Sequence, residues 1–242
     1  MMRVLVATLV LLAGAGMSCD VPGPYPRQVT AVEYGRELFN TTALSSSRFN
    51  AFSCATCHAT SSEGPTMIAG RSLEGVTQRT RWFGGMERDL LSAVNFCLVY
   101  FMRGERLGRD DERGKALYEY LASISPGRPP DGLRWRPMTV VGNVSDVPRG
   151  DPGRGAVVYA EACQSCHGAI HDGAGRLTEL APVLPEVRSE YDALFPGVSH
   201  ALVFVEKVRH GQFYGVGGNM PFFARETLSD EDLGALLTFL GL

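Results

Sequence analysis

The sequence lacks the features that mark several large classes of protein. It has no run of like charges suited to a nucleic-acid-binding arm, and its formal net charge is only −3. No stretch alternates apolar and polar residues as a half-buried strand does. Nothing resembles a serine–histidine–aspartate triad or a phosphate-binding loop, so we predict no catalytic residue and no nucleic-acid partner. What remains is a chain of ordinary globular composition, with 45% hydrophobic residues.

Cysteine is scarce, yet four of the six cysteines fall in one repeated pattern, Cys-x-x-Cys-His, at 54–58 and 163–167. In this pattern the two thiols form thioether bonds to haem vinyl groups, and the histidine binds the iron from one side. Because a histidine follows each cysteine pair directly, a zinc site is not expected. The sequence therefore predicts two covalently attached haem c groups. The predicted attachment residues and proximal iron ligands are Cys54, Cys57, His58, Cys163, Cys166 and His167.

The amino terminus has the pattern of an export signal. Arg3 is followed by an apolar run at 4–15, which is shorter than the roughly 18 residues that a membrane-spanning helix needs. We predict a signal peptide at 1–19 and export to the periplasm, where c-type haem is attached. Cleavage before Cys19 would leave a lipidated, membrane-anchored amino terminus, whereas earlier cleavage would release a soluble protein. Both outcomes stay open, and residues 20–31, which are rich in proline, are predicted to be a tether.

An internal repeat organises the rest of the chain. Each copy begins with a helical stretch that carries a glycine and an aromatic residue, at 35–39 and 155–159. Each then presents its Cys-x-x-Cys-His motif and a proline-bearing loop, and closes on apolar residues at helical spacing, at 116–121 and 233–240. Ser229 and the acidic residues after it mark the start of the second closing helix.

The repeat predicts two domains with a linker between them. The first domain is expected at 32–125 and the second at 150–242. The linker is expected at 126–149, because proline, glycine and arginine are frequent there.

This arrangement resembles the cytochrome c fold, repeated in tandem over nearly all of the mature chain. The resemblance implies an all-α structure in which the opening and closing helices of each domain cross at the glycine and aromatic positions. It also places Pro65 and Pro182 in a loop that packs under the proximal histidine and orients it. The first copy departs from the pattern by a serine-rich insert at 40–53, which we expect to form a surface loop.

The sixth ligand of the second haem is predicted to be Met220. It lies in Gly-Gly-Asn-Met-Pro at 217–221, where glycines permit a tight loop and the proline stiffens it. A neutral thioether favours reduced iron, so this haem should have a comparatively high potential. His210 and His171 are rivals, but the first ends a helical stretch and the second follows the proximal ligand too closely to reach the opposite face. His200 is assigned no role.

The sixth ligand of the first haem has two leading candidates. Residues 87–103 are predicted to form one helix, and aligning the repeats places Met102 opposite Met220. Cys97 lies five residues earlier, and five residues of helix turn about 140° beyond one revolution, so both side chains cannot point straight at one iron. Met102 is the first choice and Cys97 the alternative, with Met86 a distant third; Met67 lies too near His58.

The ligand matters because a thiolate stabilises ferric iron. The segments around Cys97, at 94–97 and 103–107, resemble the region that supplies a cysteine ligand in dihaem thiosulfate-oxidising cytochromes. The primary hypothesis is an exported dihaem cytochrome that carries electrons between redox partner proteins. The alternative is an enzyme like thiosulfate dehydrogenase, which would oxidise an inorganic sulfur compound at a His/Cys first haem.

Several cationic side chains and one indole lie in the sequence near the first site: Arg79, Arg81, Arg88, Arg103 and Trp82. Most of them are expected to be solvated surface. One or two could pair with haem propionates, as arginine and tryptophan do in many cytochromes, or attract an anionic sulfur substrate.

Overall fold

The computed structural model describes residues 29–60, 67–70, 72–83, 87–125, 147–216, 218, 220–225 and 227–242. Within these ranges the chain is helical, and its only extended pairing is two isolated bridges. The predicted signal peptide and most of the predicted tether and linker lie outside the described residues, and the end of the tether, at Thr30 and Ala31, caps and begins α1. None of the helices in the described ranges is long and apolar enough to cross a bilayer.

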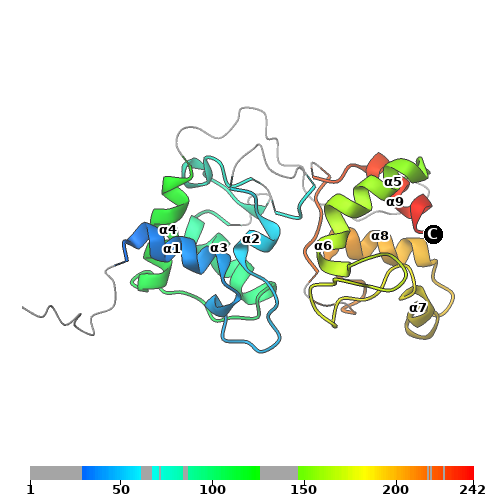
Figure 1. Cartoon of the computed structure of the whole chain (residues 1–242), viewed down its shortest axis with the longest axis horizontal. Coiled ribbons are helices and arrows are strands. Elements are labelled where there is room, and N and C mark those ends of the chain that lie inside the picture. The colour runs from blue at the N-terminus through cyan, green and yellow to red at the C-terminus, as the bar shows by residue number, and fades with distance from the viewer. Residues whose placement is uncertain are drawn as a thin grey trace, which may run out of the picture.

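The helices fall into two groups that lie beside each other (Figure 1). The first unit, described over parts of 29–125, contains α1 (Ala31–Asn40), η1 (Thr42–Leu44), α2 (Cys54–Cys57), η2 (Val76–Gln78), α3 (Leu90–Tyr100) and α4 (Glu112–Ser123). The second unit, described over parts of 147–242, contains α5 (Pro152–Val158), the π-helical turn η5 (Tyr159–Cys163), α6 (Gln164–His167), α7 (Arg188–Leu194), α8 (His200–His210) and α9 (Asp230–Phe239).

Polar caps start the opening and closing helices of both units. The side chains of Thr30, Asp111, Asp151 and Ser229 each accept a hydrogen bond from a first-turn backbone N–H of α1, α4, α5 and α9, respectively. Each cap satisfies a backbone donor that has no partner inside the helix. The predicted start of the second closing helix at Ser229 is therefore confirmed.

The opening and closing helices of the first unit cross at a glycine. A Cβ atom on Gly35 would overlap the carbonyl oxygen of Ala116, so only glycine lets α1 approach α4 this closely. One turn further on, the ring centroids of Phe39 and Tyr120 lie 5.3 Å apart. This tilted aromatic pair fills the space beside the crossing.

The second unit has the same crossing. A Cβ atom on Gly155 would overlap the carbonyl oxygen of Ala235, and the ring centroids of Tyr159 and Phe239 lie 5.9 Å apart. The helices α5 and α9 therefore meet as α1 and α4 do. Both crossings lie at the glycine and aromatic positions expected from the sequence.

Each unit has a separate apolar core. Six of the buried side chains in the first core are Leu38, Phe39, Leu98, Met102, Leu117 and Leu121. Six in the second are Val158, Tyr159, Val203, Leu233, Leu236 and Leu237. Val147 is also buried in the second core, so the chain packs onto this unit slightly before residue 150.

The serine-rich insert of the first unit is more than a surface loop. Leu44 is buried in the first core, and the buried Ser45 hydroxyl donates a 2.7 Å hydrogen bond to the carbonyl oxygen of Met102. The prediction of a surface loop at 40–53 was therefore incomplete. The short turn η1 brings one apolar and one polar side chain inward, and the polar one binds the chain just after α3.

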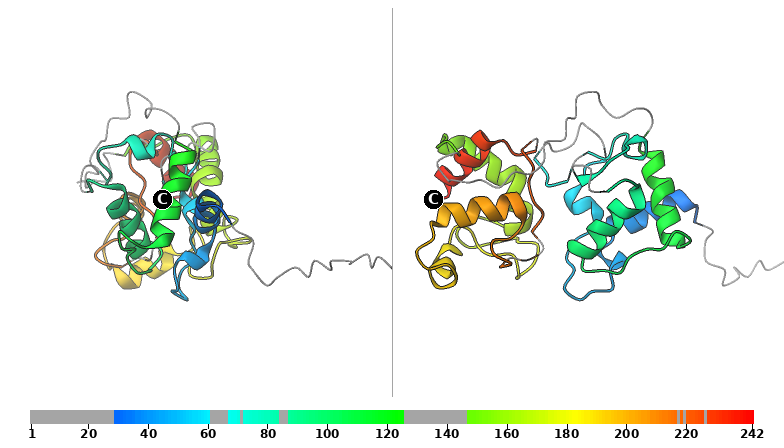
Figure 2. Two further views of the ribbon diagram at one scale, coloured as in Figure 1. Left: turned by 90° about the vertical axis from the view of Figure 1, so that its left-hand side faces the viewer. Right: turned by 180° about the vertical axis from the view of Figure 1, so that it is seen from behind.

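The two units touch along one face. Figures 1 and 2 show the segment that precedes α9 on the side of the second unit that faces the first. Phe222 in this segment lies against two rings of the first unit, with centroids 6.3 Å from Phe83 and 5.6 Å from Phe101. In the other direction, Met67 of the first unit is buried in the core of the second.

Candidate haem sites

The first unit contains an apolar cavity that the segment before α9 of the second unit helps to line. Phe52, Leu73, Val76, Ala93, Val94 and Leu98 are among the apolar residues of its wall. The predicted haem residues Cys54, Cys57 and His58 line it, and so do both candidate distal ligands, Cys97 and Met102. The structure thus brings together five side chains that the sequence had assigned to one haem.

A single helical turn places the first attachment motif. Ser53 precedes α2, its backbone N–H binds the hydroxyl of Thr56 at 3.0 Å, and the N–H of His58 donates to the carbonyl of Cys54 at 3.0 Å. The turn gives Cys54, Cys57 and His58 a common side that faces the cavity.

Gly70 lets the chain pass close to the first histidine. Its N–H donates a 2.7 Å hydrogen bond to the carbonyl of Cys57, and a Cβ atom on it would lie 2.6 Å from Cε1 of His58. Only glycine fits here without moving the imidazole. Sequence reasoning missed Gly70, although a glycine soon after a haem motif is a usable signal. Pro65, expected in this region, lies outside the described residues.

The helix that carries the distal candidates is shorter than predicted. Instead of spanning 87–103, α3 begins after Asp89, whose carboxylate accepts the N–H of Ser92, and ends at Tyr100. The N–H groups of Phe101 and Met102 both donate to the carbonyl of Cys97, which closes the last turn. The rotation of about 140° between Cys97 and Met102 applies only to a helix that continues through Met102. Because the helix ends first, both sulfur-bearing side chains can line the same cavity.

The two distal candidates differ in exposure. Met102 is 3% exposed, whereas Cys97 is half-buried and retains surface toward the cavity. Burial, reinforced by the nearby Cys54 and Cys57, raises the pKa of the Cys97 thiol. Burial likewise raises the pKa of Cys54 to about 11 and that of Cys57, beside Cys166 and Cys54, to about 12. The thiols of the first cavity are therefore neutral until they bond to a haem or a metal.

The indole of Trp82 tests whether the cavity fits a haem. Its Nε1 is buried and has no hydrogen-bond partner among the described residues, although its ring lines the cavity. An unpaired buried N–H costs free energy, and a haem propionate would satisfy it. Arg79 also lines the cavity and donates to the carbonyls of Ser72 and Glu74 at 2.6 and 2.9 Å. The apolar wall, the paired thiols and these two donors fit a haem.

The other arginines near this site are exposed: Arg81, Arg88 and Arg103. For these three, the expectation of solvated surface holds. Met67 packs in the second core rather than in the first cavity, and Met86 lies outside the described residues.

A backbone carbonyl orients the predicted proximal histidine of the second unit. His167 is 8% exposed, and its Nδ1 donates a 2.8 Å hydrogen bond to the carbonyl oxygen of Pro182. This fixes the tautomer and leaves Nε2 as the nitrogen for an iron. Burial lowers the pKa of His167 and raises that of Cys163 to about 12. The loop at Pro182 therefore contacts and orients His167, as the resemblance implied.

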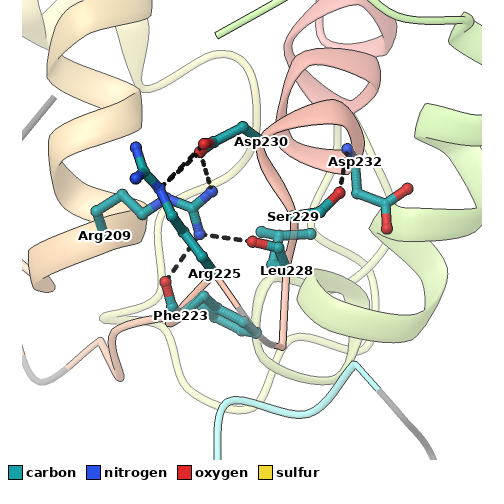
Figure 3. A network of polar contacts seen from close by, with 7 residues as sticks. All are labelled: Arg209, Phe223, Arg225, Leu228, Ser229, Asp230 and Asp232. Carbon is teal, nitrogen blue, oxygen red and sulfur yellow. Dashed lines mark hydrogen bonds and ion pairs between the residues drawn. The ribbon is translucent and has the colours of Figure 1, made fainter. Parts of the chain in front are cut away.

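Met220 precedes a segment that Arg209 ties to α8, and Figure 3 shows the contacts of Arg209 with Phe223 and Leu228. The methionine packs against the second core, and three residues later the N–H of Phe223 donates to the carbonyl of Val208 at 2.8 Å. The buried guanidinium of Arg209 donates from Nη1 to the carbonyls of Phe223 and Leu228, at 2.9 and 2.7 Å. Sequence reasoning missed Arg209; its position just before the histidine and glycine that end α8 carries no obvious signal.

The rival histidines of the second unit are paired with carboxylates. The imidazole Nδ1 of His210 lies 2.9 Å from Glu206 at the end of α8. The exposed His171 lies 2.8 Å from Glu186, and His200 lies 2.8 Å from Asp192. His210 ends α8 and His200 begins it, as expected from the sequence.

The comparisons with known proteins bear on the second unit. Residues 150–240 match the family model described as cytochrome C oxidase, cbb3-type, subunit III. A search of curated proteins found no match to the chain. Cytochrome c domains hold covalently bound haem c, transfer electrons and typically interact with redox partner proteins. The second unit is therefore similar to a cytochrome c domain, and the match supports a cytochrome c family for this part of the chain.

Proposed function

We propose that the protein is an exported dihaem c-type cytochrome that transfers electrons between redox partners through two covalently bound haems. The observation that carries the proposal is the first cavity, where both cysteines and the histidine of a haem motif share one apolar wall with a sulfur ligand candidate. The second unit has the same helix crossing and matches a cytochrome c family. A cavity of this kind in the first unit supports a second haem site.

Each residue has a stated role in the proposal. Cys54, Cys57, Cys163 and Cys166 form the thioether bonds. His58 and His167 bind iron on the proximal side, and Met220 binds the second iron on the distal side. The bound haem supplies one-electron redox chemistry. The protein fixes the ligands, excludes water and sets the surroundings of the propionates, for which Trp82 and Arg79 are candidate donors in the wall of the first cavity.

Paired substitutions test the two attachment sites separately. Replacing Cys54 and Cys57 by alanine should leave one covalent haem per chain, and replacing Cys163 and Cys166 should leave the other. The measurement is the pyridine haemochrome spectrum of protein matured with the full haem-ligation machinery. A wild type with one haem that disappears only with Cys163 and Cys166 would contradict the dihaem proposal.

The distal ligand of the first haem separates two candidate functions. With Met102 as ligand, the two haems would be similar carriers, and electron relay would be the whole function. With Cys97 as ligand, the first haem would have a much lower potential, because a thiolate stabilises ferric iron. That site would suit oxidation of an inorganic sulfur compound, as in thiosulfate dehydrogenase. The observation that supports this second function is that Cys97 is half-buried and lines the cavity.

Near-infrared magnetic circular dichroism of the oxidised protein distinguishes these ligands. Two methionine–iron charge-transfer bands would support relay, and a thiolate band that is lost in Cys97→Ala would support sulfur chemistry. If Cys97→Ala leaves the first-haem ligation unchanged and Met102→Leu alters it, the sulfur-oxidising function loses its support.

We also propose that the chain is exported through its amino-terminal signal. The support is the pattern at 1–19 and the need to attach haem outside the cytoplasm. Whether Cys19 is lipidated decides if the protein is anchored. Mass spectrometry of the mature amino terminus in wild type and Cys19→Ala tests it: a lipid mass lost in the variant would show an anchor.

A further inference from the structure

One segment of the second unit belongs to both candidate haem sites. The segment 220–228 begins with Met220, the proposed distal ligand of the second haem. Four of its described residues line the cavity of the first unit: Pro221, Phe222, Ala224 and Thr227. The wall of the first site is therefore completed by the chain that supplies the ligand of the second.

The ring of Phe222 contacts the first unit across the boundary between the two units. Its ring lies 5.6 Å from that of Phe101 and 6.3 Å from that of Phe83, both in edge-on arrangements. Phe101 directly precedes Met102, and its N–H donates to the carbonyl of Cys97. Phe222 thus touches the chain between the two distal candidates of the first haem, while it lies two residues from Met220.

The segment is held to its own unit by a buried cation (Figure 3). Arg209 is 2% exposed and binds the carbonyls of Phe223 and Leu228 from one nitrogen. Its other terminal nitrogen donates to Asp230, at the start of α9, at 2.8 Å. Three bonds from one planar group fix the segment at two points and join it to both α8 and α9.

The first unit contacts the second on the proximal side as well. Met67 is buried in the second core and Ala69 packs against it, while Ala69 also lines the first cavity beside Gly70 and His58. Both the proximal and the distal chains of the first site therefore meet the second unit.

From these contacts we propose that segment 220–228 couples the two haem sites, with Phe222 closing the first pocket against water and Arg209 acting as the positioning residue. The inference rests on the proposed function, since it concerns haems that the function requires. Exclusion of water disfavours the more highly charged ferric state, so closure by Phe222 raises the potential of the first haem. Displacing the segment would change both sites together.

The experiment compares three variants of the full-length mature protein by redox titration and near-infrared magnetic circular dichroism. Phe222→Ala should shift the midpoint potential of the first haem downward and leave that of the second haem and its methionine–iron band unchanged. Arg209→Met should weaken or abolish that band and lower both potentials, and Arg209→Lys should restore part of each. Arg154→Ala removes an exposed arginine that binds Asp232 of α9, outside the segment, and should change neither haem.

The pyridine haemochrome count separates failure of the inference from failure of the function. A count other than two haems per chain in the wild type contradicts the proposed function. With two haems present, an unchanged first potential in Phe222→Ala overturns the coupling, and so does an altered second haem with an unaltered first in Arg209→Met. Should Arg209→Met not fold, Phe222→Ala and the milder Phe222→Leu still decide the question, because Phe222 is only half-buried.

Discussion

The two units share a helix crossing but differ in how the chain places their predicted distal ligands. In the second unit, Met220 comes from an irregular segment held by a buried arginine. In the first, the candidates come from the end of helix α3, and a serine from the insert binds the backbone of Met102. The same helix crossing can therefore be combined with different segments on the side of the predicted distal ligand. This is possible because the crossings at Gly35 and Gly155 do not involve the residues that carry the candidate ligands.

The largest expected effect is the loss of stability on filling the helix crossing that both units share. Gly35→Val and Gly155→Val should each destabilise their unit by about 3 kcal/mol or more, because the added side chain would overlap a backbone carbonyl that cannot move freely. Denaturant unfolding monitored by circular dichroism measures this. Gly108→Ala is the matched control, since a Cβ there meets nothing within 4 Å. If one valine variant is as stable as the control, the two crossings are not equivalent.

The second prediction tests the different distal supports. Met220→Leu should remove the methionine–iron charge-transfer band of the second haem and lower its potential by a sizeable part of the ~0.8 V range that axial ligands span. Redox titration and magnetic circular dichroism measure both. Tyr214→Leu, at a side chain that is 86% exposed, is the control. A persistent band in Met220→Leu would assign the ligand elsewhere.

The third prediction concerns the hydrogen bond by which Ser45 of the insert holds the backbone at Met102. Ser45→Ala removes the donor to the carbonyl of Met102 and leaves that buried acceptor without its 2.7 Å hydrogen bond. We expect a loss of about 1–3 kcal/mol in the free energy of unfolding of the first unit. The neighbouring Ser46→Ala, at an exposed position, should be neutral. Equal stability of the two variants would show that this hydrogen bond does not stabilise the first unit.

The smallest expected effect is on the pH dependence of helix stability, because the N-caps of the two closing helices differ in charge. Helix α4 begins at the carboxylate of Asp111, whereas α9 begins at the neutral hydroxyl of Ser229. The hydrogen bond from Arg113 lowers the pKa of Asp111 below its ordinary value of 3.8, so the capping stability is complete above that value and is lost as pH falls through the lower folded-state pKa. Acid titration of helicity in wild type and Asp111→Asn should show a small difference above pH 3.8 that vanishes below the folded-state pKa. If the difference in helicity between the two proteins did not change with pH, the charge of the Asp111 carboxylate would not be what stabilises α4.

Local patterns predicted the parts of the structure that depend on nearby residues. The cap at Ser229 and the helical character of both units follow from residue types and spacing along the chain, and the crossing at the glycines was implied by the resemblance to the cytochrome c fold. The end of α3 was predicted too late, because apolar residues continue past Tyr100, whereas the last regular helical hydrogen bond runs from the N–H of Phe101 to the carbonyl of Cys97. The roles of Ser45, Gly70 and Arg209 could not be predicted, since each depends on a carbonyl or imidazole that the fold brings close. The contact of Phe222 with the first cavity depends on how two units pack, which no local pattern encodes.

The central claim is that one polypeptide holds two covalent haems, one in each unit. Intact-mass spectrometry of the mature protein, produced with the haem-ligation machinery, tests it most directly. The account predicts a mass equal to the processed polypeptide plus two haem groups, and loss of one group in each paired cysteine variant. A wild-type mass with a single haem, or a mass unchanged by replacing Cys54 and Cys57, would contradict it.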